Sequence, residues 1–161
     1  MGELIQVGMA ECKLARPPDK LMTAGLGSCV GICLLDPITK IASMCHIMLP
    51  YCHHDKPAVN PGKYADTAIL AAVGAMHRSG ADTDHLIAKI AGGAQMFRFS
   101  GNSDIFKIGQ RNVLSVEENL EKNKIQLLGK DIGGNVGRTI VFDPATGNLA
   151  IRTIHEGDKI I

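Results

Sequence analysis

A cysteine and a histidine in the first third of the chain have the side-chain types of a catalytic pair. Cys29 ends the glycine-rich stretch MTAGLGSC, and His46 lies in the apolar run IASMCHIML. A thiol beside an imidazole loses its proton more easily, and the thiolate attacks acyl carbons. Thr23, near the start of the glycine-rich stretch, could supply a hydroxyl that orients the imidazole. Cys29, His46 and Thr23 are therefore the candidate catalytic residues.

The glycines near Cys29 suggest a place for a negatively charged oxygen. Gly25 and Gly27 can adopt positive φ and let a substrate approach bare backbone. Backbone N–H groups around Ser28 could then face the oxyanion of a tetrahedral intermediate. The later pair Gly92-Gly93 either makes a tight turn or adds donors around the substrate. Four residues are thus candidates for substrate or oxyanion contact: Gly27, Ser28, Gly92 and Gly93.

Two apolar segments must position the pair. Val30–Leu35 and Ile41–Leu49 are typical of buried strands, and the Asp-Pro of Asp36–Thr39 suits a type I turn between them. These segments predict a hairpin. The alternative is that Cys29 and His46 are ordinary core residues, since a lone cysteine is most often a small buried hydrophobe.

The length of the turn decides which residues face each other. If Asp36–Thr39 is a four-residue turn, Leu35 pairs with Lys40 and Cys29 lies directly opposite His46. Directly opposed side chains have Cβ atoms about 4.5–5.5 Å apart, which allows a hydrogen bond. A three-residue turn would instead put the thiol and the imidazole on opposite faces of the hairpin.

The rest of the chain predicts one α+β domain over residues 1–161. A helix is expected over Tyr64–Ser79, where apolar residues recur at three and four and Gly80 can end the helix. The other expected elements are a helix over Asn112–Asn123 and strands over Leu4–Met9, Glu11–Ala15, His85–Ala91, Ile125–Leu128, Thr139–Phe142 and Asn148–Ile154. Their order predicts a layered α+β domain with a largely antiparallel sheet.

Composition excludes several classes of protein. The net charge is +1, which argues against a nucleic-acid partner. The chain has neither a signal peptide nor an apolar run of about 20 residues, so we expect a cytoplasmic protein without membrane insertion. Five cysteines, an odd number, are expected to be reduced thiols in that compartment.

A metal site is an alternative use of the cysteines and histidines. Cys45, His46, Cys52, His53 and His54 lie within ten residues, and all are possible Zn²⁺ ligands. Neighbouring residues of a strand point to opposite faces, however, and the chain has no C-x-x-C pair. We therefore expect no metal, and a zinc analysis of the purified protein would distinguish the two interpretations.

Several short motifs follow one another along the chain. They are Gly25-Leu26-Gly27-Ser28-Cys29-Val30, His46-Ile47-Met48-Leu49-Pro50, Lys63-Tyr64-Ala65-Asp66, Ala88–Met96, Ile108-Gly109-Gln110-Arg111-Asn112, and Asp131-Ile132-Gly133-Gly134 with Gly137-Arg138. Each motif is weak alone, and the ordered set is strong. Together they resemble the CheD family, the chemoreceptor glutamine deamidases of bacterial chemotaxis, and the resemblance covers roughly residues 20–154.

The resemblance implies an α/β sandwich related to the cytotoxic necrotizing factor-type deamidases and a reaction without a cofactor. Cys29 would be the nucleophile, His46 the base and acid, and Thr23 the partner that orients the histidine. The substrate would be a glutamine on the exposed face of a coiled coil in methyl-accepting chemotaxis receptors. The same thioester could meet methanol or an amine, which would give methylesterase or transglutaminase activity.

The resemblance also implies a non-enzymatic alternative. Family members bind the phosphatase CheC, in a complex that answers to phosphorylated CheY, so the chain could be a chemotaxis adaptor that binds receptors and a CheC-type phosphatase. Ammonia release from receptors would distinguish the enzyme from the adaptor.

Arg111 and Arg138 are expected in structural ion pairs rather than in substrate contact.

Overall fold

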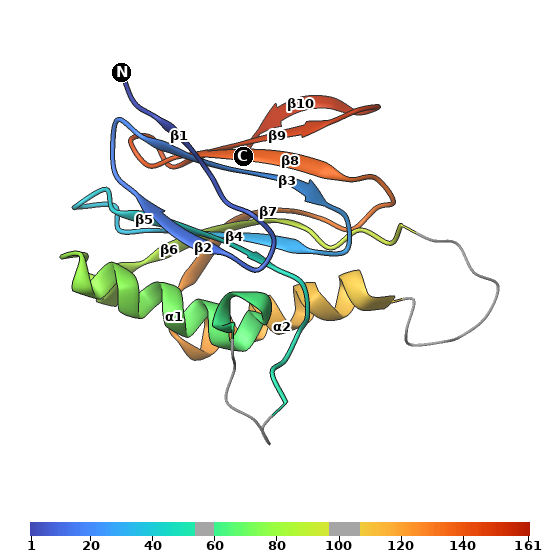
Figure 1. Ribbon diagram of the computed structural model, residues 1–161, viewed down its shortest axis with the longest axis horizontal. Coiled ribbons are helices and arrows are strands. Elements are labelled where there is room, and N and C mark those ends of the chain that lie inside the picture. Colours follow the sequence, from blue (N-terminus) through green and yellow to red (C-terminus); the bar gives the residue numbers. More distant parts are fainter. Residues whose placement is uncertain (54–59, 97–106) are drawn as a thin grey trace.

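The chain forms three layers: two stacked sheets and a pair of helices (Figure 1). The computed structural model describes residues 1–53, 60–96 and 107–161. The outer sheet has the order β1 (Leu4–Gln6), β3 (Lys20–Leu26), β8 (Arg138–Asp143), β9 (Asn148–Thr153), β10 (Gly157–Ile160). The central sheet has the order β2 (Cys12–Ala15), β5 (Ala42–Ile47), β4 (Val30–Leu35), β6 (Ile87–Gly92), β7 (Gln126–Ile132). The helices are α1 (Ala65–Arg78) and α2 (Ile108–Lys122), with the short 3₁₀ helices η1 (Pro61–Lys63) and η2 (Thr83–His85).

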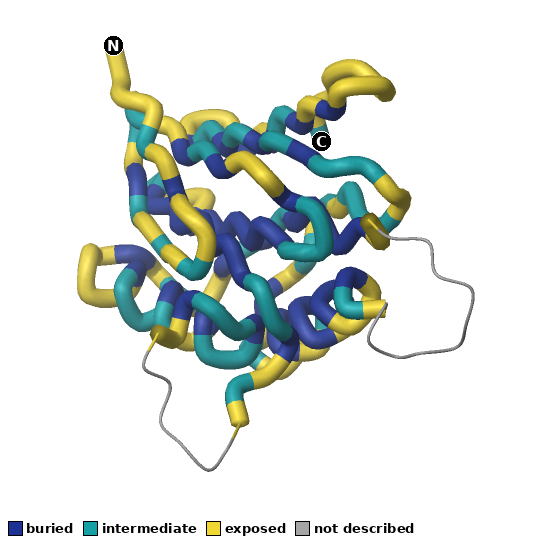
Figure 2. Tube along the Cα trace, turned by 45° about the vertical axis from the view of Figure 1, so that its right-hand side comes forward, coloured by how far each residue is buried: buried dark blue, intermediate teal, exposed yellow. Residues whose placement is uncertain are grey.

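The central sheet lies between the other two layers, so its inner strands β4 and β5 are covered on both faces (Figure 1). Every residue of β4 and β5 is buried (Figure 2). Ile32 and Leu34 pack toward the helices, whereas Cys33 and Leu35 pack toward the outer sheet. A strand covered on both faces has no need of polar alternation, which explains the continuous apolar sequence VGICLL.

The first helix confirms the expectation from apolar spacing. The buried residues of α1 recur at intervals of three and four, and they pack on the central sheet. Gly80 has φ +99° and follows the last turn, where its N–H and that of Ala81 donate to carbonyls of that turn. The helix therefore ends with the glycine in the position predicted for it.

The single sheet expected from the sequence is wrong, because the strands divide into two sheets. Six of the eight strand pairings are antiparallel, as predicted, and β1–β3 and β6–β7 are parallel. Strand β3 was not expected, because its glycine is atypical of strands. Gly25 has φ +69° and lies where the β3–β8 register shifts, so it forms a bulge within a real strand.

The hairpin of β4 and β5 forms, but its predicted register is wrong. Its four-residue loop begins one residue later than expected, because Lys40 adopts a left-handed conformation (φ +63°). Asp36 therefore pairs with Ile41, with its N–H 3.0 Å from the Ile41 carbonyl oxygen. Leu35 consequently faces Ala42 rather than Lys40. Moving the whole loop by one residue shifts the register by two, so each side chain keeps its predicted face.

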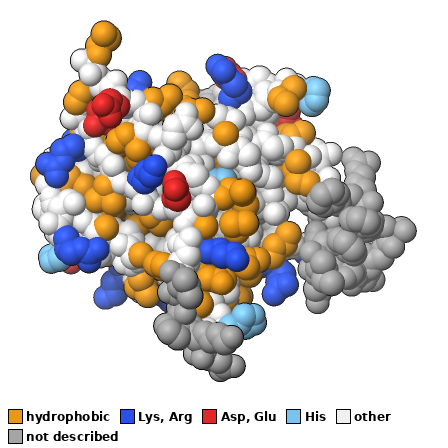
Figure 3. All heavy atoms as spheres, in the orientation of Figure 1, with side chains coloured by type: hydrophobic (Ala, Val, Ile, Leu, Met, Phe, Trp, Pro, Cys, Tyr) orange, Lys and Arg blue, Asp and Glu red, His pale blue; other side chains and the backbone are white. Residues whose placement is uncertain are grey.

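No helix in the described part of the chain is long and apolar enough to cross a membrane. On the face seen in Figure 3, charged side chains are scattered among apolar and uncharged ones. This distribution agrees with the net charge of +1 and gives that face no strongly basic patch.

Candidate active site

The three candidate catalytic residues come from both sheets. Thr23 lies on β3 of the outer sheet and is 1% exposed, and His46 lies on β5 of the central sheet and is 0% exposed. The Thr23 Oγ1 atom is 2.7 Å from the His46 Nδ1 atom, so a hydrogen bond crosses the space between the sheets. Cys29 directly precedes β4, is partly exposed, and packs against the same inter-sheet core. The fold therefore brings all three residues to one region between the sheets.

Cys29 does not lie directly opposite His46, which corrects the predicted pairing. Gly31 occupies that position, and Cys29 precedes it by two residues on the same side of the sheet. A Cβ atom on Gly31 would lie 2.6 Å from the Ile140 Cδ1 atom, so the missing side chain lets the two sheets approach beside the imidazole. Counted along the β4–β5 register, Cys29 is thus diagonal to His46 rather than opposite it. Within the described residues, the buried His46 Nε2 atom has no hydrogen-bond partner.

A backbone carbonyl determines which nitrogen of His46 carries the proton. The Thr23 hydroxyl also lies 2.6 Å from the Val7 carbonyl oxygen, which can only accept. A hydroxyl has a single hydrogen, so it donates to Val7 and accepts from the Nδ1–H of His46. The neutral imidazole then carries its free electron pair on Nε2. This is the tautomer that a general base needs when its Nδ1 is held by an orienting partner.

Burial favours the uncharged forms of the thiol and the imidazole. It raises the pKa of the Cys29 thiol, an effect partly offset by the N–H of Cys29 itself. It also lowers the pKa of His46. Both directions disfavour a resting thiolate–imidazolium pair. Burial therefore favours an uncharged thiol at Cys29 and an uncharged imidazole at His46.

The glycines near Cys29 allow two backbone segments to approach closely. Gly92 has φ +121°, and a Cβ atom there would overlap the Cys29 carbonyl. The Gly93 N–H donates to that same carbonyl (2.9 Å), and the Ala94 N–H donates to the carbonyl of Gly27 (2.8 Å). The Gly93 and Ala94 donors therefore hold the turn Gly27-Ser28-Cys29, which carries the candidate nucleophile and is called the nucleophile turn.

The nucleophile turn also contains backbone N–H groups that are available to donate to a substrate. Within the described residues, the N–H groups of Ser28 and Cys29 make no backbone hydrogen bond to another residue, whereas the Gly27 N–H donates to the Gly25 carbonyl (3.0 Å). The Cys29 N–H favours its own thiolate, although burial outweighs this effect and the pKa of the thiol is raised. An N–H beside the nucleophilic sulfur has the position of an oxyanion donor.

Three contacts around the site had no counterpart in the sequence analysis. One is the Val7 carbonyl described above. Another is Asn112 of α2, a buried residue whose amide nitrogen donates to the carbonyls of Ser28 (2.9 Å) and Met48 (3.0 Å). The third is the hydrogen bond from the Ala10 N–H to the His46 carbonyl (2.8 Å). Asn112 had a sequence signal, since polar residues recur at three and four beside the apolar stripe of α2.

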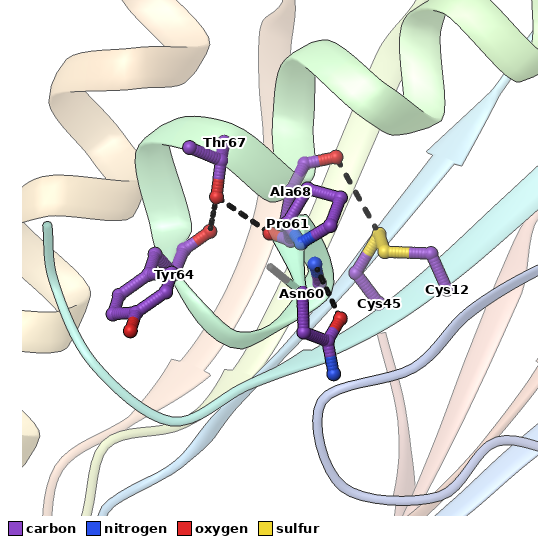
Figure 4. The surroundings of a disulfide bond; sticks show 8 residues. Cys12, Cys45, Asn60, Pro61, Tyr64, Thr67 and Ala68 are labelled. Carbon is purple, nitrogen blue, oxygen red and sulfur yellow. Dashed lines mark hydrogen bonds between the residues drawn. A yellow bond between two sulfur atoms is a disulfide. The ribbon is translucent and has the colours of Figure 1, made fainter. Parts of the chain in front are cut away.

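Two of the five cysteines form a disulfide, so the expectation of five reduced thiols is wrong. Cys12 and Cys45 are direct partners on β2 and β5, with Cα atoms 4.1 Å apart (Figure 4). The bond lies beneath α1, and the Cys45 Sγ atom is 3.9 Å from the Ala68 carbonyl oxygen. Counting cysteines could not reveal this pair, because the strand register brings the two sulfurs together.

The remaining thiols differ from Cys29 in their surroundings. Cys33 is completely buried between the sheets, and burial strongly raises its pKa. Cys52 is partly exposed, and its N–H donates to Asp66 (3.1 Å) away from His46. Cys29 is therefore the partly exposed thiol on the side of the central sheet that His46 faces.

The cysteines and histidines of the metal alternative are not gathered. Cys45 is in the disulfide and faces the helices, whereas His46 faces the outer sheet. His54 lies outside the described residues. In the part of the chain that the structure describes, no three His, Cys, Asp or Glu side chains form a group able to hold a metal ion.

Arg111 and Arg138 were both expected in ion pairs, and among the described residues only Arg138 forms one. Its Nε atom is 3.0 Å from the Asp131 carboxylate, which Lys159 also contacts (2.6 Å). A further N–H of Arg138 reaches the Gly92 carbonyl (3.4 Å). Arg111 is exposed on α2 and has no ion pair with a described residue.

Comparisons with known proteins agree with the motifs. The family model described as "CheD chemotactic sensory transduction" matches residues 48–153. A "Probable chemoreceptor glutamine deamidase CheD" of Syntrophomonas wolfei is 56% identical, and one of Desulfitobacterium hafniense is 52% identical. A "Chemoreceptor glutamine deamidase CheD" of Halalkalibacterium halodurans is 48% identical. All three alignments cover 100% of both chains.

Proposed function

We propose that this chain, which belongs to the CheD family, is a chemoreceptor glutamine deamidase that uses Cys29 as its nucleophile. The observation that carries the proposal is the Thr23–His46 hydrogen bond between the sheets, on the same side as the partly exposed Cys29. A thiol, an imidazole and an orienting hydroxyl are the parts that acyl transfer requires. The names of its full-length relatives give the acyl group as a glutamine amide of a chemoreceptor.

The reaction begins with proton transfer from the Cys29 thiol to Nε2 of His46 as sulfur attacks the amide carbon. The Cys29 N–H supports the oxygen that becomes negative. His46 then returns its proton to the leaving nitrogen, which departs as ammonia and leaves a thioester. Water attacks the thioester, with His46 accepting its proton. Release of the glutamate side chain returns that proton to the thiol.

Thr23 keeps His46 ready for both proton transfers. Since the hydroxyl donates to Val7, it accepts from Nδ1–H in the neutral and in the protonated imidazole. This hydrogen bond becomes stronger when the ring gains a positive charge. Thr23 thus stabilises the imidazolium that forms in each transition state.

Several finer assignments are part of the proposal. We infer that Gly27 and Ser28 contact the substrate as part of the nucleophile turn, and that Gly92 and Gly93 act by holding this turn. The partners would be methyl-accepting chemotaxis receptors and a CheC-type phosphatase, and the fold would be related to the cytotoxic necrotizing factor-type deamidases. Methylesterase and transglutaminase activities would follow from other acceptors of the same thioester.

The test compares three proteins on purified receptor signalling fragments. Wild type should release ammonia and raise the fragment mass by about 1 Da per converted glutamine, because NH₂ is replaced by OH. Cys29→Ala should do neither. Cys52→Ser, which removes another partly exposed thiol, should behave as wild type.

Deamidation by Cys29→Ala would refute the role of this thiol. A folded wild type that binds receptor fragments and releases no ammonia would favour the adaptor function. Receptor binding by Cys29→Ala is measured in parallel, because the proposal expects binding to survive loss of the sulfur atom.

A further inference from the structure

One side chain from α2 joins the two segments that carry the nucleophile and the base. The Asn112 amide nitrogen donates one hydrogen to the Ser28 carbonyl (2.9 Å) and the other to the Met48 carbonyl (3.0 Å). Ser28 directly precedes Cys29, and Met48 follows His46 by two residues. Among the side chains that the structure describes, only that of Asn112 donates to both segments. The amide is 0% exposed, so water cannot replace these bonds at low cost.

The two hydrogen bonds from Asn112 lie beyond the end of the pairing between β4 and β5. The β4–β5 ladder begins with Val30 opposite Ile47, so Cys29 is outside it. Backbone bonds from Gly93 and Ala94 tie the nucleophile turn to the segment after β6, and not to β5. The distance between the Cys29 thiol and the His46 imidazole is thus set beyond the last strand pair. At this end of the sheet, the Asn112 side chain connects the segment before Cys29 with the segment after His46.

We propose that Asn112 is a positioning residue that fixes the Cys29 thiol relative to the His46 imidazole. The inference rests on the proposed function, because it assigns Asn112 to the geometry of the same proton transfer. An amide nitrogen has two hydrogens in one plane and can serve two carbonyls at once. Aspartate has the same shape and cannot donate when ionised, whereas serine has one hydrogen to donate.

The chemistry of α2 supports a role beyond packing. The apolar residues Val113, Val116 and Leu120 fill the neighbouring stripe of α2, whereas Asn112 lies on a buried polar stripe with Ser115 and Asn119. The Oδ1 atom of Asn112 is buried and has no hydrogen-bond partner among the described residues. A buried acceptor without a partner lowers stability. The two donated bonds, rather than burial itself, therefore account for an amide at this position.

The kinetic test is Asn112→Ala, with Asn119→Ala as the matched control. Asn119 is also buried on α2, but its amide donates to Ser115 within the same helix. Asn112→Ala should lower kcat about 10- to 100-fold with KM changed less than about threefold, since misplacement by about 1 Å has such an effect on rate. Asn119→Ala should keep kcat within about twofold of wild type. If Asn112→Ala does not fold, Asn112→Asp is measured instead and should show the same loss.

A second measurement needs no receptor. The rate of Cys29 alkylation by iodoacetamide is followed against pH by peptide mass spectrometry, with His46→Ala as reference. In wild type, His46 assists removal of the thiol proton, so the two profiles differ. The Asn112→Ala profile should move to that of His46→Ala, while the Asn119→Ala profile should match wild type.

Three results would overturn the inference. They are an unchanged kcat in folded Asn112→Ala, an equal loss in Asn119→Ala, or a loss of kcat with the wild-type alkylation profile. Absence of ammonia release from wild type would refute the proposed function alone. The alkylation profiles would still decide whether Asn112 positions the thiol.

Discussion

Replacing Thr23 with valine removes a hydroxyl and keeps the shape of the side chain. In the structure this hydroxyl accepts from His46 Nδ1–H (2.7 Å) and donates to the Val7 carbonyl (2.6 Å). A hydrogen bond to a charged group contributes about 1.5–3 kcal/mol, and the imidazole is charged in the transition state. Since about 1.4 kcal/mol corresponds to tenfold in rate, kcat should fall about 10- to 150-fold. KM should change little, because the hydroxyl acts through His46.

The assay is steady-state ammonia release from receptor fragments by wild type, Thr23→Val and Thr23→Ser. Thr23→Ser keeps the hydroxyl and should keep kcat within about threefold, with a stability loss of about 1 kcal/mol for one buried methyl group. Thr23→Val also leaves two buried groups unpaired, at about 1–3 kcal/mol each, so urea denaturation must show that it is folded. The reasoning fails if folded Thr23→Val is as active as wild type, or if Thr23→Ser loses as much activity as Thr23→Val.

Two further predictions concern pH and the disulfide. Burial lowers the pKa of His46, and the base must be neutral to accept a proton, so the acid limb of kcat/KM should lie below the ordinary histidine value of about 6.5; an acid limb above pH 7 would contradict this. The Cys12–Cys45 bond joins residues 33 apart in sequence. Loop-closure entropy then predicts that dithiothreitol lowers the free energy of unfolding by about 2–4 kcal/mol in urea titrations. The same reagent should leave a Cys12→Ser/Cys45→Ser variant unchanged, and equal effects on both proteins would show that this disulfide is not the cause.

The sequence predicted elements well where one pattern dominates. The continuous apolar run of β4 and the three-four spacing of α1 both gave the right element within a residue or two. Strand β3 escaped detection because Gly25 forms a bulge there, and no local pattern shows that a strand pair will tolerate it. The division into two sheets also follows from packing between distant segments, such as β3 with β8.

The candidate site was predictable in its residues and less so in its contacts. The hairpin places Cys29 and His46 on one side, although the loop begins one residue later than its Asp-Pro sequence suggests. The prediction that both side chains share a face remains correct, because a register shift of two residues preserves the face of each side chain. The hydrogen bonds of the Asn112 amide and of the Val7 carbonyl could not be predicted, because each set depends on the approach of three segments far apart in sequence.

The unpaired nitrogen of His46 unites these observations. A buried polar atom without a partner lowers stability by about 1–3 kcal/mol, and native folds retain few of them. Among the residues that the structure describes, the Nε2 atom has no hydrogen-bond partner, while Nδ1 is held by a hydroxyl that donates its own proton to Val7. A histidine kept only for packing could turn its free nitrogen toward a partner or be replaced by an apolar residue. The proposed role of His46 as a base accounts for this free electron pair, because catalytic hydrogen bonds often tighten only when substrate binds.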